Sequence, residues 1–255
     1  MTLELLTIPC RSDNYAFVLH DAFTGQTAVV DVPDHTPILA ALKKRDWTLS
    51  HILITHHHDD HIGGVDPLRT ATGARVFGAA ADAHRLPQLD QSLRDGDTLP
   101  FGAEMIHVLD VPGHTLGHIA FHLPTSRYAF TADSLMAAGC GRLFEGTPLQ
   151  MHASLAKLSL LPPETLICSG HEYTASNLRF AAFVDPTNAA LQDRIADTTA
   201  ARAANRPTVP SRLSLELATN PFLRANTPAL RETCQMPNAT AAEVFAELRA
   251  RKDRF

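Results

Sequence analysis

Four histidines and two aspartates stand close together in Thr55-His56-His57-His58-Asp59-Asp60-His61. The apolar run His51-Ile52-Leu53-Ile54 before them predicts a short buried strand, and Ile62-Gly63-Gly64 after them is turn-like. We therefore expect the cluster on a loop between a strand and a helix. Imidazole nitrogens and carboxylate oxygens at this spacing are ligands for zinc, iron or manganese. A solvated histidine run or an affinity tag is the alternative, but tags lie at chain ends and lack interleaved aspartates.

The spacing inside the cluster also predicts how many metal ions one loop can serve. In an extended segment, His56 and His58 point to the same side. Asp60 and His61 begin the next turn and can face a point a few ångströms away. The loop could thus contribute to two metals about 3.5–4 Å apart, which is the separation of two-metal hydrolytic sites.

Composition limits the class of protein. The 255 residues are 45% hydrophobic and 19% charged, which is ordinary for a globular protein that can bury a good core. The net charge of −5 gives no reason to expect binding to nucleic acid or to a membrane surface. The four cysteines form no CxxC pair and are too sparse for a disulfide framework, which favours a reducing compartment. No basic, apolar export signal opens the chain and no apolar run approaches about 18 residues, so we expect a cytoplasmic protein.

The periodicity of apolar residues predicts an α/β layered protein whose last part is helical. Residues 86–100 are expected to be mostly loop, and no strand run of any length is expected after residue 174. The predicted strands are Leu3–Ile8, Ala16–His20, Thr27–Val32, His51–Ile54, Arg75–Gly78, Glu104–Val111, Ile119–Leu123, Tyr128–Thr131 and Thr165–Cys168. The predicted helices are Pro37–Leu42, Asp66–Thr72, Pro148–Leu160, Asn177–Val184, Asn188–Arg202 and Ala241–Arg251.

The pattern Thr-His-x-His-x-Asp-His at residues 55–61 resembles the signature of the metallo-β-lactamase superfamily. Within it, the chain looks like glyoxalase II, the hydroxyacylglutathione hydrolases, through Gly170-His171-Glu172-Tyr173-Thr174 and Asn220-Pro221-Phe222-Leu223-Arg224. Asp13-Asn14-Tyr15 adds weaker support. The resemblance implies a four-layer αββα sandwich with a C-terminal helical domain. It places the catalytic domain at residues 1–173 and a glutathione-binding domain at 174–255.

The resemblance also implies the remaining metal ligands. His114 follows Pro112-Gly113 on a turn, where alone it would pass for a surface histidine. Asp133 stands at a strand end, where a carboxylate usually caps a helix, and His118 is expected to be supporting or structural. The family pattern makes Asp133 a bridge between two metals. The implied ligands are His56, His58, His114 and Asp133 for metal one, and Asp60, His61, Asp133 and His171 for metal two.

Five further positions match glutathione-binding residues of the family. Family members use a basic residue followed two positions later by an aromatic, often tyrosine; this chain has phenylalanine there, which cannot donate a hydroxyl hydrogen bond. Tyr173 could instead be a core tyrosine at a helix start, and the basic C-terminal residues could simply be solvated. The implied substrate-binding residues are Arg142, Phe144, Tyr173, Arg249 and Lys252.

The expected activity is hydrolysis of the thioester S-D-lactoylglutathione to D-lactate and glutathione by a metal-bound hydroxide, the second step of methylglyoxal detoxification. Asp60 and Asp133 are the expected catalytic carboxylates, two divalent ions the expected cofactors, with zinc preferred to iron or manganese, and a monomer the expected state. Other activities of the superfamily are rivals: a persulfide dioxygenase with one iron, a β-lactamase, an esterase or a nuclease. A non-catalytic metal-binding or thiol-conjugate-sensing protein is a rival of another class, but all predicted ligands are present.

Overall fold

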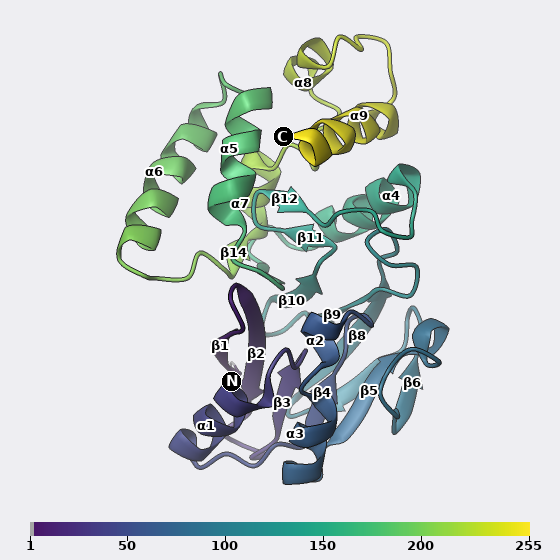
Figure 1. Cartoon of the computed structure of the whole chain (residues 1–255), viewed down its shortest axis with the longest axis vertical. Helices are drawn as coiled ribbons and strands as arrows, with labels where there is room; N and C mark the ends of the chain where they lie inside the picture. The colour runs from purple at the N-terminus through teal and green to yellow at the C-terminus, as the bar shows by residue number, and fades with distance from the viewer. Residues whose placement is uncertain (1–2) are drawn as a thin grey trace. The chain divides into compact units, whose positions relative to one another are not determined.

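The computed structural model describes residues 3–255, which divide into two compact units (Figure 1). Unit 1 contains the chain up to Asp110 and Gly117–Ala132. Unit 2 contains Val111–Leu116 and Asp133–Phe255. The units are regions of dense packing, whereas the predicted boundary between residues 173 and 174 separates a catalytic from a substrate-binding region. That boundary stays a prediction.

The first sheet of unit 1 has the strand order β1-β2-β3-β4-β5-β6. Neighbours are antiparallel from β1 to β3 and parallel from β3 to β6. Parallel neighbours need a crossover, which α1 and α3 supply between β3, β4 and β5. The strands are β1 (Glu4–Cys10), β2 (Asn14–His20), β3 (Thr27–Val30), β4 (His51–Leu53), β5 (Arg75–Ala79) and β6 (Gln91–Leu93).

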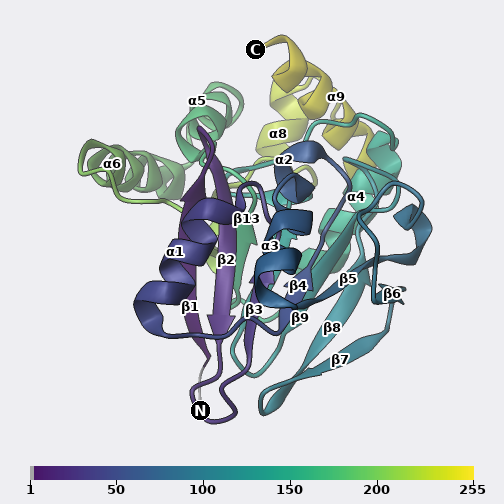
Figure 2. The ribbon, with the colours of Figure 1, turned by 60° about the horizontal axis from the view of Figure 1, so that its bottom comes forward.

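Helices cover one face of this sheet (Figure 2). Ile38 and Leu42 of α1 (His35–Arg45) and Leu68 of α3 (Val65–Thr72) pack in one core with inward residues of the strands. The backbone N–H of Thr36 donates to the Asp34 side chain, which caps α1. Two short helical turns, α2 (Asp59–Ile62) and η1 (Ala80–Asp82), follow β4 and β5.

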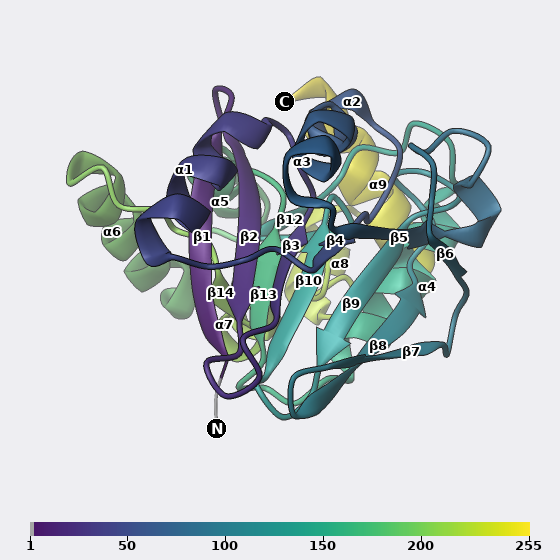
Figure 3. The ribbon, with the colours of Figure 1, turned by 90° about the horizontal axis from the view of Figure 1, so that it is seen from below.

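The other face of the first sheet meets four antiparallel strands of a second sheet, in the order β10-β9-β8-β7 (Figure 3). The rings of Phe17 and Phe130 lie 5.6 Å apart between the two sheets, and those of His51 and Phe101 are equally close. Unit 1 is thus layered as predicted. The strands are β7 (Thr98–Phe101), β8 (Glu104–Asp110), β9 (Ile119–Leu123) and β10 (Tyr128–Ala132).

Unit 2 is mostly helical. Its helices are α4 (Pro148–Ser159), α5 (Thr174–Val184), α6 (Ala189–Ala203), α7 (Leu213–Thr219), α8 (Pro228–Thr233) and α9 (Ala241–Arg254). Its strands are β11 (Leu135–Met136), β12 (Gly139–Cys140), β13 (Leu166–Ser169) and β14 (Ser211–Arg212). Among the described residues after 174, the only strand is the two-residue β14, which pairs with β13.

A polar network holds the β11–β12 hairpin in unit 2. The fully buried Asn220 donates from Nδ2 to the carbonyls of Met136 and Gly139, at 3.1 and 2.9 Å. The Glu216 carboxylate accepts from the backbone N–H of Ala138 and forms a buried ion pair with Arg194. The Asn-Pro-Phe motif therefore fixes the hairpin that lies just before the residues predicted to bind glutathione.

The predicted elements are present with small shifts at their ends. The loop expected at 86–100 contains β6 and the start of β7. The short elements η1, β11, β12, β14, α7 and α8 were not expected. These pieces are short, and Pro100 stands within β7, so local patterns give little signal for them. None of the helices within residues 3–255 is long and apolar enough to cross a membrane.

Candidate metal centre and substrate site

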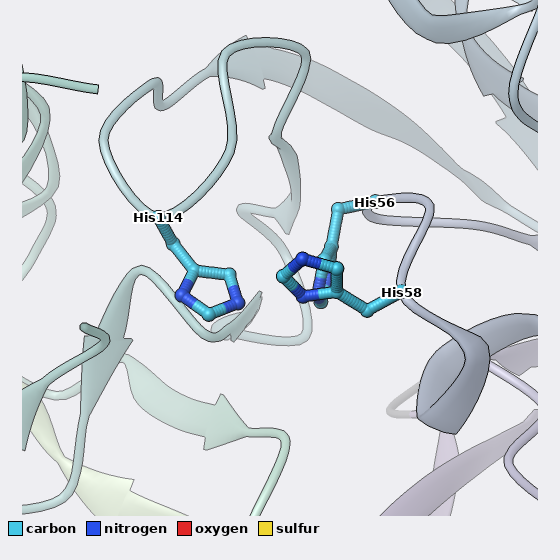
Figure 4. Close-up of side chains that lie close together, drawn as sticks. All are labelled: His56, His58 and His114. Atoms are coloured by element: carbon cyan, nitrogen blue, oxygen red, sulfur yellow. The ribbon is translucent and has the colours of Figure 1, made fainter. Parts of the chain in front are cut away.

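The histidine cluster lies where the sequence predicts it, on the loop from β4 into α2. Figure 4 shows His56 and His58 projecting from this loop, together with His114 from the loop after β8. Nε2 of the buried His56 and Nδ1 of the half-buried His58 lie 3.2 Å apart. The two rings thus turn a nitrogen to the same point, as the alternation of an extended segment predicts.

Asp31, which the sequence does not single out, orients this loop through contacts with its first and last residues, Thr55 and His61. Its Oδ2 accepts from Thr55 Oγ1 and faces Nδ1 of His61, both at 2.8 Å, and its Oδ1 accepts from the Thr55 N–H at 2.9 Å. Nδ1 of His56 lies 3.0 Å from Thr55 Oγ1. Asp31 has a left-handed φ of 56°, a costly conformation that places its carboxylate under the loop.

Asp31, His56 and His61 are all buried, and each has one ligand atom within 4.8 Å of the others. Such a trio could hold a metal ion by itself. However, both oxygens of Asp31 already face the N–H and O–H groups of the loop, so this carboxylate acts as an orienting group.

His57, within the loop, and His118, outside it, make further contacts in unit 1. His57 points its Nδ1 at Oδ2 of the buried Asp82, 3.0 Å away, while Asp82 Oδ1 accepts from Arg85. Gly117 lies against the same carboxylate, and a side chain there would meet it at 2.2 Å. The buried ring of His118 stacks on His56, with centroids 4.6 Å apart. His118 therefore supports a predicted ligand through packing.

Unit 2 brings together the other three predicted ligands. Asp133 Oδ2 lies 3.5 Å from Nε2 of His114 and 3.4 Å from Nε2 of His171, and all three side chains are buried. Asp133 follows Ala132, whose left-handed φ of 40° turns the chain sharply at the end of β10. A single carboxylate oxygen thus stands between two imidazoles.

The segment from Gly141 to Gly146 holds His114 in place. Nδ1 of His114 lies 2.7 Å from the carbonyl oxygen of Arg142, and the N–H of Phe144 donates to the His114 carbonyl. Gly141 has no room for a side chain, because a Cβ would stand 1.9 Å from the Asp133 carbonyl oxygen. The same short segment therefore orients a predicted metal ligand and carries predicted glutathione contacts.

The predicted substrate residues near these ligands are exposed. Arg142 has 61% of its side chain exposed and lies 3.6 Å from the Asp253 carboxylate. Phe144 is equally exposed and packs edge-on against His114, with centroids 5.3 Å apart. The exposed Tyr173 stacks on His171 at 4.6 Å. All three side chains are therefore accessible from solvent.

Arg249 and Lys252 of α9 are more enclosed. Arg249 is buried and donates to the Cys140 carbonyl at 3.0 Å and to Asp253 at 2.9 Å. The half-buried Lys252 has its ammonium 5.5 Å from the Phe180 ring and 5.4 Å from the Phe255 ring. Burial, and secondarily the positive charge of Arg249, lowers the pKa of Lys252. Lys252 is thus a cation beside two aromatic rings, where an anionic group is bound more strongly than in water.

The donor set was tested for its fit to divalent metal ions. Nδ1 of His61 faces a carboxylate oxygen and Nδ1 of His114 faces a carbonyl oxygen. Because these oxygens only accept, each Nδ1 carries the hydrogen, and each Nε2 keeps the lone pair that a metal needs. Within each unit, the imidazole nitrogens and carboxylate oxygens are donors that suit divalent metals favouring nitrogen and oxygen ligands.

Comparison with known proteins places the chain in a family. A metallo-β-lactamase superfamily model matches residues 16–171, and a model of the hydroxyacylglutathione hydrolase C-terminus matches residues 172–255. The hydroxyacylglutathione hydrolase of Cereibacter sphaeroides is 63% identical, over 100% of both chains. That of Jannaschia sp. is 61% identical, over 99% of this chain and 98% of its own length. The chain belongs to the hydroxyacylglutathione hydrolase family.

Solved structures agree with this hydroxyacylglutathione hydrolase family fold. The B3 metallo-β-lactamase BLEG-1 has a TM-score of 0.67 at 22% identity, covering 86% of this chain and 99% of its own. ETHE1 from Myxococcus xanthus has a TM-score of 0.65 at 25% identity, covering 99% and 98%. The predicted metallo-β-lactamase fold and the predicted family are thus confirmed, and the chain is a metal-dependent hydrolase.

The sequence of this family member does not single out the residues that orient the histidine loop. Asp31, Asp82 and Asn14 lie 30, 25 and 46 positions from the loop residues that they contact. Asp31 directly follows the apolar residues Ala28-Val29-Val30, so a carboxylate at the end of a predicted buried strand was an available signal. Nothing in the sequence marks Asp82.

Proposed function

We propose that this protein hydrolyses S-D-lactoylglutathione to D-lactate and glutathione. The observation that carries the proposal is the 63% identity, over the whole chain, to a curated hydroxyacylglutathione hydrolase. The metallo-β-lactamase fold alone would not decide the substrate, because one fold hosts many activities. The match of residues 172–255 to the C-terminal model of this family adds support, since the residues proposed to bind glutathione near the C-terminus lie there.

The proposal assigns two divalent ions, preferably zinc, to the predicted ligands. His56, His58, His114 and Asp133 would hold the first ion, and Asp60, His61, Asp133 and His171 the second. Support comes from the ring nitrogens that meet at His56 and His58, and from the imidazoles on either side of Asp133 Oδ2. Imidazole and carboxylate ligands also suit iron and manganese, so zinc is the part of the assignment that metal analysis must decide.

When bound, such ions activate water as a nucleophile at neutral pH and polarise a carbonyl oxygen. The chain's own contribution is orientation. Asp60 would accept a hydrogen bond from the attacking water. Asp133 is fixed between His114 and His171, and its burial keeps bulk water from competing for the carboxylate.

The glutathione part of the substrate would be bound by residues of unit 2. Glutathione carries two carboxylates, and Arg142, Arg249 and Lys252 are cations that can bind them. Tyr173 offers a hydroxyl group for the peptide backbone, and Phe144 offers an exposed apolar ring. Holding the tripeptide places the thioester carbonyl and converts binding energy into orientation. The monomeric state and the cytoplasmic location stay predictions.

The test is hydrolysis of S-D-lactoylglutathione by the zinc-loaded protein, followed as the loss of thioester. We expect activity in the wild type, its loss with His58→Ala, and no change with His84→Ala, because His84 is exposed and outside the proposed ligand set. An intact, zinc-loaded protein that leaves this thioester uncleaved overturns the proposal. A persulfide or an ester would then be the next substrate to test.

A further inference from the structure

Asn14 is a buried polar residue that the proposed reaction does not use. It opens β2 directly after the turn at residues 11–13, and it is 3% exposed. Its Nδ2 lies 2.9 Å from the backbone oxygen of Asp60 and 3.1 Å from Asp60 Oδ2. A carbonyl oxygen only accepts, so the amide group must turn its NH₂ toward Asp60. The carboxylate of Asp60 therefore receives a hydrogen bond from a fixed donor.

A second residue of the same turn reinforces this contact. Arg11, at a left-handed φ of 48°, donates from Nε to the Pro33 carbonyl and from Nη2 to the Asp59 carbonyl, both at 2.9 Å. Gly63 leaves room for the guanidinium, because a Cβ there would stand 2.5 Å from Nη2. Arg11 and Asn14 thus hold the carbonyls of two successive residues, Asp59 and Asp60.

The segment that they hold needs such support. Helix α2 has only four residues and its first turn has no side-chain cap. A single helical turn is unstable by itself because its hydrogen bonds do not repay the lost chain entropy. The side chain of Asp60 is also 37% exposed, so packing alone does not fix its rotamer. The hydrogen bond from Asn14 restrains this side chain.

We propose that Asn14 is a positioning residue that sets the Asp60 carboxylate for the second metal ion. The inference rests on the proposed function. Hydrogen-bonding partners of metal ligands typically change metal affinity or activity by about 10- to 100-fold when they are removed. Asn14 is not among the residues proposed to bind glutathione, so its removal should lower kcat and leave KM unchanged.

The experiment compares the wild type with Asn14→Leu, Asn14→Asp and Ser12→Ala, all loaded with zinc. Asn14→Leu keeps the branched shape of the side chain and removes the donor. Asn14→Asp keeps the shape and turns an acceptor toward the Asp60 oxygens. Ser12→Ala is the matched control, because it changes the same turn at an exposed side chain whose recorded hydrogen bond is to Asp13. Steady-state kinetics, thermal unfolding and the rate of zinc transfer to a chelator are measured for each.

Both Asn14 variants should lose about 10- to 100-fold in kcat with KM within about twofold. One of the two zinc ions should transfer to the chelator faster than in the wild type, while Ser12→Ala matches the wild type. Wild-type kcat and zinc release in either Asn14 variant overturn the proposal, as does a loss of kcat with both ions held normally. Asn14→Asp keeps the comparison valid if Asn14→Leu does not fold.

Failure of the substrate assignment is distinguishable from failure of this inference. If the wild type does not cleave S-D-lactoylglutathione, the proposed function fails, but the zinc-transfer rates still report on Asn14. If the wild type is active and the Asn14 variants release zinc normally, only the positioning role fails.

Discussion

The histidine loop at residues 55–61 and the proposed glutathione residues of unit 2 are held in different ways. Around the loop, Asp31, Asp82 and Asn14 each contact a predicted ligand or its neighbour through buried or half-buried contacts of about 3 Å or less. Among the proposed glutathione residues, Arg142 and Phe144 are 61% exposed. The predicted metal ligands are thus oriented by the protein itself, whereas most of the proposed substrate contacts are open to solvent.

This difference has a physical reason. Metal ligation tolerates little error in ligand position, so each ring and carboxylate is oriented by a second group. A flexible tripeptide with two charged ends can be bound by mobile side chains, whose ordering costs about 0.5–1.5 kcal/mol each. Substitutions in the first region should therefore change kcat and metal retention, and those in the second should change KM.

Asp31→Asn should have the largest effect. The amide keeps the shape but has one acceptor oxygen fewer, and an NH₂ group in the place of Oδ2 faces the Thr55 hydroxyl and Nδ1 of His61. His61 loses its orienting acceptor, so we expect kcat and zinc affinity to fall by about 10- to 100-fold with KM unchanged. Kinetics and zinc titration measure both. A rise in KM without loss of zinc would break the contrast between the two regions.

Gly141→Ala tests the segment of unit 2 that carries proposed glutathione contacts beside the predicted ligands His114 and Asp133. The new methyl would stand 1.9 Å from the Asp133 carbonyl oxygen and 3.1 Å from His114 Nδ1. We expect a loss of about 1–3 kcal/mol in the free energy of unfolding, and a fall in kcat because His114 shifts. Thermal unfolding and kinetics measure these changes.

The matched control for this substitution is Gly73→Ala, which also strains the chain but leaves the site alone. Gly73 has a φ of +69° and nothing within 4 Å of a Cβ. It should lower the free energy of unfolding by about 1 kcal/mol without changing kcat. Equal kinetics in both variants would show that Gly141 affects stability only.

Lys252→Ala should raise KM about tenfold, which corresponds to about 1.4 kcal/mol of binding, and leave kcat nearly unchanged. The pH dependence sharpens this prediction. Burial and the neighbouring Arg249 and Arg179 lower the pKa of Lys252, so its charge is lost at a lower pH than for an ordinary lysine. KM should therefore rise as the pH increases through this lowered pKa.

Lys252→Arg provides the control, since arginine stays charged throughout this range. Its KM should be flat where that of the wild type rises. The same alkaline rise in both proteins would show that another group causes it.

Much of the fold could be predicted because its signals are local. The apolar run before Thr55 and the alternation along β8 identify strands, and Pro148 marks the start of α4. The seven predicted ligands follow from motifs, and the structure gathers them in two groups, one in each unit. Those assignments await metal analysis.

The orienting groups could not be predicted in the same way. Asn14 meets Asp60 only because the β1–β2 turn and α2 fold onto each other, and 46 positions separate the two residues in the sequence. The burial of Arg249 likewise depends on how α9 packs beside the β11–β12 hairpin in unit 2. Contacts of this kind are set by tertiary packing, which one sequence without relatives does not display.

Phe144→Tyr should have the smallest effect and tests the departure from the family pattern. Phe144 is 61% exposed and its ring packs on His114, so an added hydroxyl needs no new space. A hydrogen bond gains about 0.5–1.5 kcal/mol, so KM for S-D-lactoylglutathione should fall by roughly two- to tenfold with kcat unchanged. Phe144→Leu, which has no hydroxyl, should not lower KM. If tyrosine changes kcat instead, residue 144 acts through His114. This residue would then affect both a predicted metal ligand and substrate binding.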